Sequence, residues 1–275
     1  MTGSNAGQAA VAFRHASVAV PELDGLPSRV ILDDLTLEVQ DGETLVLLGK
    51  SGAGKTTALK LVNRLLEPTR GEVLVEGRST KAWDPIALRR RIGYVIQEIG
   101  LLPHFTVEQN VGLVPRLEGW PAEKVHARVL EMLRMVGLEP RTFAKRYPRA
   151  LSGGQRQRVG VARALAADPH LLLMDEPFGA LDPVTRVDLQ QQFLNLQQRL
   201  SKTVVFVTHD LREAIFLGTR IGLLEEGRLL GVFSPEEFLA ARLPAVRDYC
   251  SAFSLRDPRL AGSAADEPRP TESSS

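Results

Sequence analysis

One stretch constrains this chain more than any other: a glycine-rich segment lying between an apolar run and a helical pattern. Residues 49–57 read Gly-Lys-Ser-Gly-Ala-Gly-Lys-Thr-Thr and fit the P-loop pattern G-x-x-x-x-G-K-[ST]. Residues 44–48 before them are an apolar run of strand length, and apolar residues recur at helical spacing through 57–66. A strand, a tight turn and a helix start, in that order, direct unpaired N–H groups and a helix dipole at one point. The segment therefore predicts an α/β fold with an anion site.

This anion site predicts binding of a nucleoside triphosphate. The glycines allow the backbone to close around a β-phosphate, Lys55 supplies a point charge, and the Thr56 hydroxyl can bind Mg²⁺. The alternative is a glycine-rich turn that contains lysine by chance, which arises on the order of once per hundred chains of this length. The residues expected to bind nucleotide here are Gly49, Ser51, Gly52, Gly54, Lys55, Thr56 and Thr57.

Composition excludes several classes of protein. The chain has 275 residues, with 34 Lys plus Arg against 33 Asp plus Glu, so its net charge indicates neither nucleic acid nor membrane lipid as a partner. Cys250 is the only cysteine, which rules out an internal disulfide and suits a reducing compartment. No apolar run approaches the roughly 20 residues needed to cross a bilayer. Residues 1–10 lack the features of a signal peptide, so a soluble, cytoplasmic protein is expected.

Strands and helices are predicted to alternate along most of the chain. Strands are predicted at 11–20, 30–39, 44–48, 72–76, 92–96, 171–174 and 204–208. Helical periodicity dominates residues 98–148, which predicts a helical insertion, and the helix after Pro183 is expected to bury one apolar stripe. That stripe consists of Leu189, Phe193, Leu196 and Leu200. The alternation predicts a mainly parallel sheet in one domain spanning 11–255, with disordered segments at 1–10 and 256–275.

An apolar strand ending in two acids, Asp175 and Glu176, is the second chemical signal. In P-loop proteins an aspartate at this place helps to hold Mg²⁺, and the adjacent glutamate can orient or deprotonate the attacking water. Strands often end in acids, so the signal gains its weight from the P-loop that precedes it.

A third signal is the turn that opens the predicted helix near residue 153. Ser152 followed by Gln155 predicts a capping box. Two glycines in a first helical turn cost about 1 kcal/mol each relative to alanine, and they expose N–H groups that suit a second phosphate contact. The residues expected to contribute are Ser152, Gly153, Gly154 and Gln155.

Taken in order, these segments resemble the motifs of ATP-binding cassette (ABC) proteins. They are residues 49–56, Gln97, residues 151–155, 171–176 and 179–182, and His209. The resemblance runs from about Val11 to Phe253. It implies a P-loop core with a mainly parallel sheet, an antiparallel β subdomain and a helical subdomain at about 98–160.

The resemblance also implies roles for individual residues and a homodimer that binds ATP and Mg²⁺. Ser152 and Gly154 would contact ATP held by the other subunit, Asp182 would lie at the dimer seam, and His209 would touch the γ-phosphate. The catalytic residues so implied are Glu176, His209 and Gln97, and the implied Mg²⁺ ligands are Thr56, Gln97 and Asp175.

Within the family, the helical region looks like the ATPases of glycine betaine, choline and related osmoprotectant importers. The similar stretches are 92–107, 118–121, 136–140 and 146–148. The resemblance implies an ATPase on the inner face of the cell membrane, coupled to permease subunits and indirectly to a solute-binding protein, with no nucleic-acid partner. Many such ATPases continue into CBS domains, which are expected to be absent here. The apolar residues expected either to receive the permease or to fill the helical core are Ile99, Leu101, Leu102 and Phe105.

Two rival functions remain beside this one. The first is the ATPase of a lipid-trafficking ABC system. The second is a soluble ABC ATPase acting in DNA repair or translation. Such soluble proteins usually carry two cassettes, a long coiled coil or a metal-binding insert, whereas this chain shows one cassette, no heptad run and one cysteine.

The first predicted strand departs from the family pattern at Val20. Aligning residues 13–21 with the usual opening strand places Val20 where many cassettes have an aromatic ring that stacks on adenine. Val20 is expected to contact the base weakly, unless the loop from Pro21 to Arg29 covers the base instead.

Overall fold

The computed structural model describes residues 9–21, 28–97, 100–179, 181–200 and 202–254. It divides the chain into two compact units, Met1–Pro235 and Glu236–Ser275, where the sequence predicted a single domain over 11–255. The predicted disorder at 1–8 and 256–275 falls outside the described residues. Ala10 is already part of the fold, because its N–H donates to the Val39 carbonyl at 2.9 Å.

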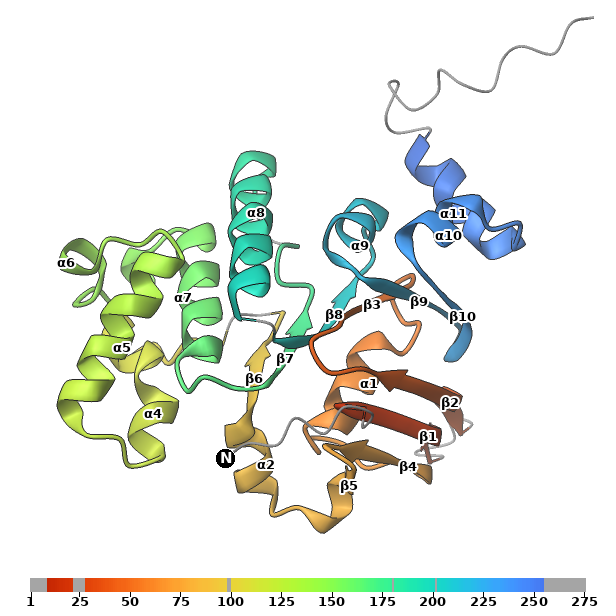
Figure 1. Cartoon of the computed structure of the whole chain (residues 1–275), viewed down its shortest axis with the longest axis horizontal. Helices are drawn as coiled ribbons and strands as arrows, with labels where there is room; N and C mark the ends of the chain where they lie inside the picture. The colour runs from red at the N-terminus through yellow and green to blue at the C-terminus, as the bar shows by residue number, and fades with distance from the viewer. Residues whose placement is uncertain (1–8, 22–27, 98–99, 180, 201, 255–275) are drawn as a thin grey trace, which may run out of the picture. The chain divides into compact units, whose positions relative to one another are not determined.

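A six-stranded sheet forms one layer of the first unit, with strand order β10-β9-β3-β8-β7-β6 (Figure 1). Its strands are β3 (Thr44–Leu48), β6 (Ile92–Val95), β7 (Leu171–Asp175), β8 (Thr203–Thr208), β9 (Arg220–Glu225) and β10 (Arg228–Phe233). All neighbouring pairs are parallel except β9 with β10. All residues of β3, β7 and β8 are buried, as expected for parallel strands covered on both faces.

A second, antiparallel sheet has the order β2-β1-β4-β5. Its strands are β1 (Val11–Val20), β2 (Arg29–Val39), β4 (Arg70–Val75) and β5 (Arg78–Ser79). Helix α1 (Lys55–Val62) lies between the two sheets and contacts both (Figure 1). The main hydrophobic core joins Phe13 of β1, Leu59 of α1 and Val205 of β8. The carboxyl end of β3 therefore opens directly into the P-loop and α1.

Helices occupy the chain between β5 and β6 and between β6 and β7. They are η1 (Thr80–Ala82), α2 (Pro85–Arg91), α3 (Val107–Val111), α4 (Leu113–Leu117), α5 (Ala122–Met135), α6 (Pro140–Phe143), η2 (Pro148–Ala150) and α7 (Gly153–Leu165). Helix α5 packs one stripe inward, including the buried side chains of Val125, Val129 and Leu133. The helices from α3 to α7 lie between Val107 and Leu165, in the part of the chain where the sequence predicts a helical subdomain at about 98–160.

Two further helices of the first unit follow β7 and β8. In α8 (Pro183–Leu200), the predicted stripe is buried at Leu189 and Phe193, and the side chains of Leu196 and Leu200 lie outside the described residues. Helix α9 is Leu211–Leu217. The second unit contains most of α10 (Pro235–Ala240) and all of α11 (Pro244–Ser254). Across the described parts of the chain, every helix is too short or too polar to cross a membrane.

Candidate functional site

The P-loop takes the backbone form that the glycine pattern predicts. Gly52 and Gly54 have φ values of 83° and 96°, a left-handed region that favours glycine. Gly49 is needed for a different reason, because a Cβ there would lie 2.4 Å from the carbonyl oxygen of Leu224. Helix α1 then begins at Lys55 with no side-chain cap on its first N–H groups. An uncapped helix start facing a glycine-rich loop is a ready anion site.

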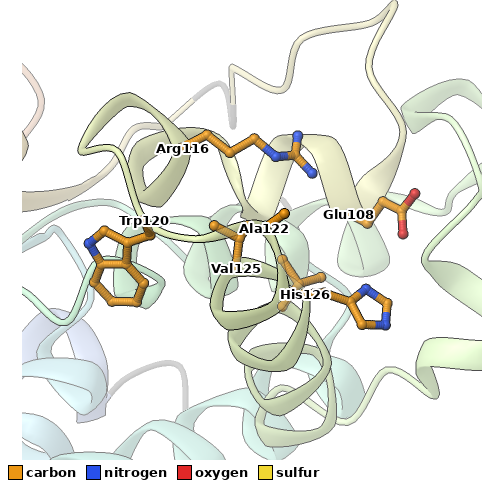
Figure 2. Close-up of a pocket in the computed structure, with 7 residues that line it drawn as sticks. Glu108, Arg116, Trp120, Ala122, Val125 and His126 are labelled. Carbon is orange, nitrogen blue, oxygen red and sulfur yellow. The ribbon is translucent and has the colours of Figure 1, made fainter.

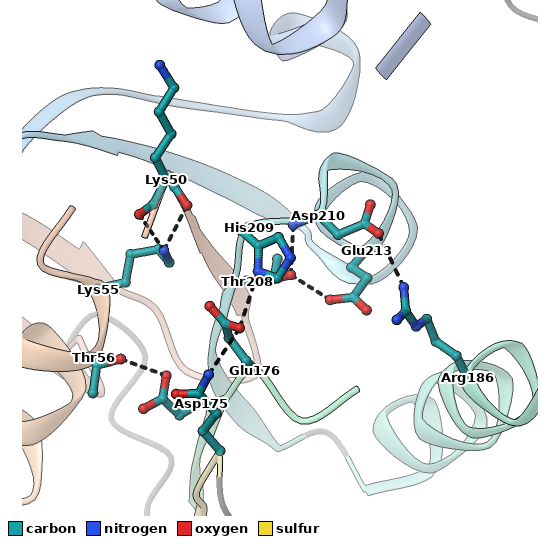
Figure 3. Close-up of polar contacts among 12 residues, drawn as sticks. Lys50, Lys55, Thr56, Asp175, Glu176, Arg186, Thr208, His209, Asp210 and Glu213 are labelled. Atoms are coloured by element: carbon teal, nitrogen blue, oxygen red, sulfur yellow. Dashed lines mark hydrogen bonds and ion pairs between the residues drawn. The ribbon is translucent and has the colours of Figure 1, made fainter. Parts of the chain in front are cut away.

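Lys55 and Asp175 bring opposite charges together in the buried floor of this loop (Figure 3). The Lys55 ammonium donates to the carbonyl oxygens of Gly49 at 2.7 Å and Lys50 at 2.9 Å. Burial lowers the pKa of Lys55, and the Glu176 and Asp175 carboxylates oppose that shift. Burial raises the pKa of Asp175, against a hydrogen bond of 2.9 Å from the Thr56 hydroxyl. Burial thus disfavours the charged forms of both Lys55 and Asp175, and a bound ligand of opposite charge could stabilise each of them.

Glu176 lies at the centre of a second group of side chains (Figure 3). Its φ of 44° is unusual for a residue with a side chain, and its N–H donates to the Val207 carbonyl at 3.0 Å. The carboxylate oxygen Oε2 lies 3.2 Å from His209 Nδ1 and accepts a bond of 3.4 Å from Gln97 Nε2. Gln97 and His209 are far apart in the sequence, and both contact the Glu176 carboxylate. The family resemblance implied a catalytic role for all three residues.

The predicted capping box at the start of α7 is confirmed. The Ser152 hydroxyl accepts from the Gln155 N–H at 3.2 Å, and the Gln155 side chain accepts from the Ser152 N–H at 3.0 Å. Gly154 allows a close approach to α8, since a Cβ there would lie 2.9 Å from Thr185 Cγ2. The Thr185 N–H donates to Asp182 at 3.0 Å, and this backbone hydrogen bond lowers the pKa of Asp182. The turns of Ser152 and Asp182 are thus neighbours within one chain.

The predicted site residues form two groups in one chain. Within the described residues, no hydrogen bond or ion pair joins the Ser152–Gln155 turn to residues 49–57. Ser152 and Asp182 are both exposed, and the hydrogen bonds described for them are made within their own turns. This separation leaves the second turn available to another molecule.

Val20 is the last residue of β1. It pairs with Arg29 and is 40% exposed. Two residues earlier, Val18 pairs with Leu32. A Cβ at Gly54 would lie 2.8 Å from Leu32 Cδ2, so this part of the sheet is close to the P-loop. Val20 is therefore about 7 Å further along the strand from that contact. Residues 22–27 of the alternative base-covering loop lie outside the described residues.

The sequence-based reasoning missed a buried polar network behind His209. Glu213 in α9 is 4% exposed and is hydrogen-bonded to Thr208 and Gln190. Asp210 followed by Glu213 has the spacing of a capping box, which could have drawn attention to this turn. Asp210 does cap α9, but Glu213 turns to Thr208.

The fold and this site together define a P-loop protein of the nucleoside-triphosphate-binding class. The profile of the ABC transporter family matches residues 32–179, which is more than half of the chain. The chain belongs to the ABC transporter family. The fold class predicted from the sequence is confirmed, since the dimeric, ADP- and Pi-bound ATP-binding cassette MJ0796 superposes with a TM-score of 0.75. That similarity has 36% sequence identity and covers 82% of this chain and 98% of the other.

Two relatives are similar over most of this chain. The osmoprotectant import ATP-binding protein OsmV of Salmonella typhimurium is 51% identical over 216 residues, covering 78% of this chain and 56% of OsmV. The glycine betaine/carnitine/choline transport ATP-binding protein OpuCA of Bacillus subtilis is 52% identical over 208 residues, covering 76% and 54% respectively. The chain thus spans a little over half the length of these relatives.

Proposed function

We propose that this chain binds and hydrolyses ATP as a subunit of an ABC importer for quaternary amines of the glycine betaine and choline type. The observation that carries the proposal is the meeting of Gln97, Glu176 and His209 beside the P-loop lysine. The names of the relatives OsmV and OpuCA support import of osmoprotectants as the use of that energy.

The donor set at residues 56 and 175 fits Mg²⁺. A hydroxyl and a carboxylate are hard oxygen ligands, and the carboxylate is buried with a raised pKa, so a cation there would offset its desolvation. No cluster of three or more metal-binding side chains occurs among the described residues, so nucleotide and water would complete the coordination. Mg²⁺ would neutralise phosphate charge when bound.

In this proposal each side chain of the cluster has a distinct task. Lys55 leaves its two carbonyl acceptors and turns to the phosphates. Glu176 orients the attacking water and accepts its proton, and Gln97 and His209 hold that carboxylate in place. Hydrolysis is then controlled by whether the γ-phosphate is brought to this group.

The exposed turn at Ser152 is proposed to bind the ATP held by a second copy. The turn presents N–H groups at the start of α7 and lacks a link to its own P-loop, as described above. The similarity to a dimeric ABC cassette supports this pairing. Two ATP molecules would then lie between two chains, and their hydrolysis would open the dimer.

A pocket in the helical subdomain is proposed to receive a helix of the permease. It has a volume of about 330 Å³ and lies over the first turns of α5 (Figure 2). Glu108 and Arg116 give it both signs of charge, while Trp120 and Val125 give it apolar surface, which suits an amphipathic helix. Of the residues expected either to receive the permease or to fill the helical core, Leu101, Leu102 and Phe105 are half-buried, which fits either role, and Ile99 lies outside the described residues.

Uptake of a labelled solute tests the whole proposal. Cells that lack osmoprotectant import, but express this chain with its cognate permease and binding protein, are expected to accumulate glycine betaine at high osmolarity. The matched control Lys55→Ala is expected to reduce uptake to background, because the P-loop charge is lost. Equal uptake with and without this chain, or uptake of a lipid instead, would contradict the proposed role.

Base selectivity is predicted to be weak because of Val20. Stacking of a base on an aromatic ring is worth about 1–3 kcal/mol in nucleic-acid complexes, and valine offers no ring. ATP should therefore be preferred over GTP by no more than about tenfold, or about 1.4 kcal/mol, and Val20→Tyr should tighten ATP binding. Competition binding of the two nucleotides measures both effects. Strong ATP selectivity that tyrosine leaves unchanged would show that the loop at 21–29 contacts the base.

A further inference from the structure

Glu213 is a buried carboxyl group to which the proposed hydrolysis assigns no task. Its Oε2 accepts a hydrogen bond of 2.6 Å from the Thr208 hydroxyl (Figure 3). Its Oε1 accepts one of 3.2 Å from Gln190 Nε2. Burial raises the pKa of Glu213, which the bond from Thr208 opposes. A buried carboxyl group is unfavourable unless such partners hold it. Its position must therefore serve either stability or the neighbouring turn.

The Thr208 hydroxyl connects Glu213 to the turn that carries His209. The same oxygen accepts a bond of 3.0 Å from the Asp210 N–H, so the residues on both sides of His209 are joined through one hydroxyl. Asp210 accepts from the Arg212 N–H at 2.8 Å, which fixes the start of α9. The backbone on either side of His209 is thus held by hydrogen bonds.

Helix α8 is attached to this turn at two places. Arg186 Nη1 lies 3.6 Å from Asp210 Oδ2 (Figure 3). Gln190, further along the helix, donates to Glu213. The helix starts directly after Asp182, whose carboxylate accepts from Thr185. Arg186 and Gln190 lie about 6 Å and about 12 Å along the helix from Asp182. One helix therefore joins the Asp182 turn to the His209 turn.

We infer that Glu213 is a positioning residue that holds His209 at Glu176 through the Thr208 hydroxyl, and that Gln190 ties this unit to α8. Glu213 touches no reacting atom and acts only through His209. The inference rests on the proposed ATP hydrolysis for its effect on rate. Movement of the Asp182 turn would, by the same links, be passed to His209.

The alternative is that Glu213 only stabilises the fold. Both accounts allow a variant to be less stable, so stability does not distinguish them. They differ in whether the effect depends on His209. A positioning residue loses its effect on rate once His209 is removed, whereas a purely structural residue affects both backgrounds equally.

The strand β8 offers a matched pair of substitutions. Thr203 and Thr208, at its two ends, are both 1% exposed, and each hydroxyl donates to a carboxylate and accepts from a backbone N–H. The two ends are about 16 Å apart. Thr208→Val is expected to lower kcat for Mg-ATP hydrolysis by about tenfold to a hundredfold while the Kd for ATP stays within about twofold. Thr203→Val should leave kcat unchanged, and Thr208→Ser should restore it.

The decisive comparison is made with His209→Ala. Adding Thr208→Val to His209→Ala is expected to give no further loss of kcat, and multiplied losses would overturn the inference. Should Thr208→Val not fold, Gln190→Met tests the same dependence, since it removes only the link to α8. Full kcat in Gln190→Met would also overturn the tie to α8.

A second readout does not require hydrolysis. The chain has five histidines, and the side-chain NMR signal of His209 can be assigned by its loss in His209→Ala. This signal is expected to shift in Thr208→Val and not in Thr203→Val; an unshifted signal would overturn the inference. A wild type that hydrolyses no ATP would contradict the proposed function alone, and the NMR comparison would still decide the role of Glu213.

Discussion

Replacing Glu176 with glutamine is expected to lower ATP hydrolysis by at least about a hundredfold while ATP binding survives. Glutamine keeps the size of the side chain and can still bond to Gln97 and His209, but it cannot accept the proton of the attacking water. The phosphates would be held by the P-loop as before. Release of inorganic phosphate from Mg-ATP measures the loss, and equilibrium binding of ATP measures what is kept. Chelating Mg²⁺ with EDTA should stop hydrolysis by the wild type.

Glu226 provides the control for this substitution. It also follows a strand and has a φ of 47°, close to the 44° of Glu176, but it is exposed and lies outside the cluster. Glu226→Gln therefore tests the effect of the same chemical change at a similar backbone position, and it should leave hydrolysis unchanged. Near-normal turnover in Glu176→Gln would remove Glu176 from the catalytic role.

Ser152→Arg is expected to abolish hydrolysis without weakening ATP binding by an isolated chain. Ser152 is exposed, and its turn makes no hydrogen bond to its own P-loop among the described residues. An arginine would remove the capping hydroxyl and fill the surface proposed to meet the ATP of the partner chain. Phosphate release is measured at a protein concentration at which the wild type hydrolyses ATP. ATP binding is measured at a lower concentration that keeps the chain monomeric, so the two effects are separated.

Loss of the helix cap at Ser152 must be distinguished from loss of the proposed contact between Ser152 and the ATP of the partner chain. Thr106 and Gln109 form a second capping box, at the start of α3, with the same reciprocal bonds. Thr106→Arg should cost a similar amount of stability, about 1 kcal/mol, and leave hydrolysis intact. Equal loss of hydrolysis in both variants would mean that Ser152 acts only by capping. Full activity of a chain shown by light scattering to be monomeric would contradict the shared site.

Features carried by neighbouring residues could be predicted from the sequence. The strand at 11–20, the strand at 44–48 and the Ser152 capping box occur as predicted, because alternation, apolar runs and caps are local properties. The P-loop glycines have the predicted conformation for the same reason. The roles of Gln97 and His209 beside Glu176 were predicted from the family resemblance and not from any local sequence signal.

Other features depend on contacts between distant segments and could not be predicted in this way. Strands β9 and β10 lie at one edge of the sheet, and no motif marked residues 220–233. The approach of Gly154 to Thr185 depends on how α7 packs on α8. Burial of Glu213 among Thr208 and Gln190 likewise joins three elements. An unmarked glutamate in a helix is usually a surface residue, so only the fold indicated that this one is buried.

ATP is expected to close two copies of this chain around shared sites, and the mass of the Glu176→Gln variant tests this claim most directly. This variant should bind Mg-ATP and remain closed, because it cannot hydrolyse the nucleotide. Light scattering is expected to give the 30.2 kDa of one chain without nucleotide and twice that value with Mg-ATP. A mass that remains at 30.2 kDa when ATP binding is saturated would contradict the claim.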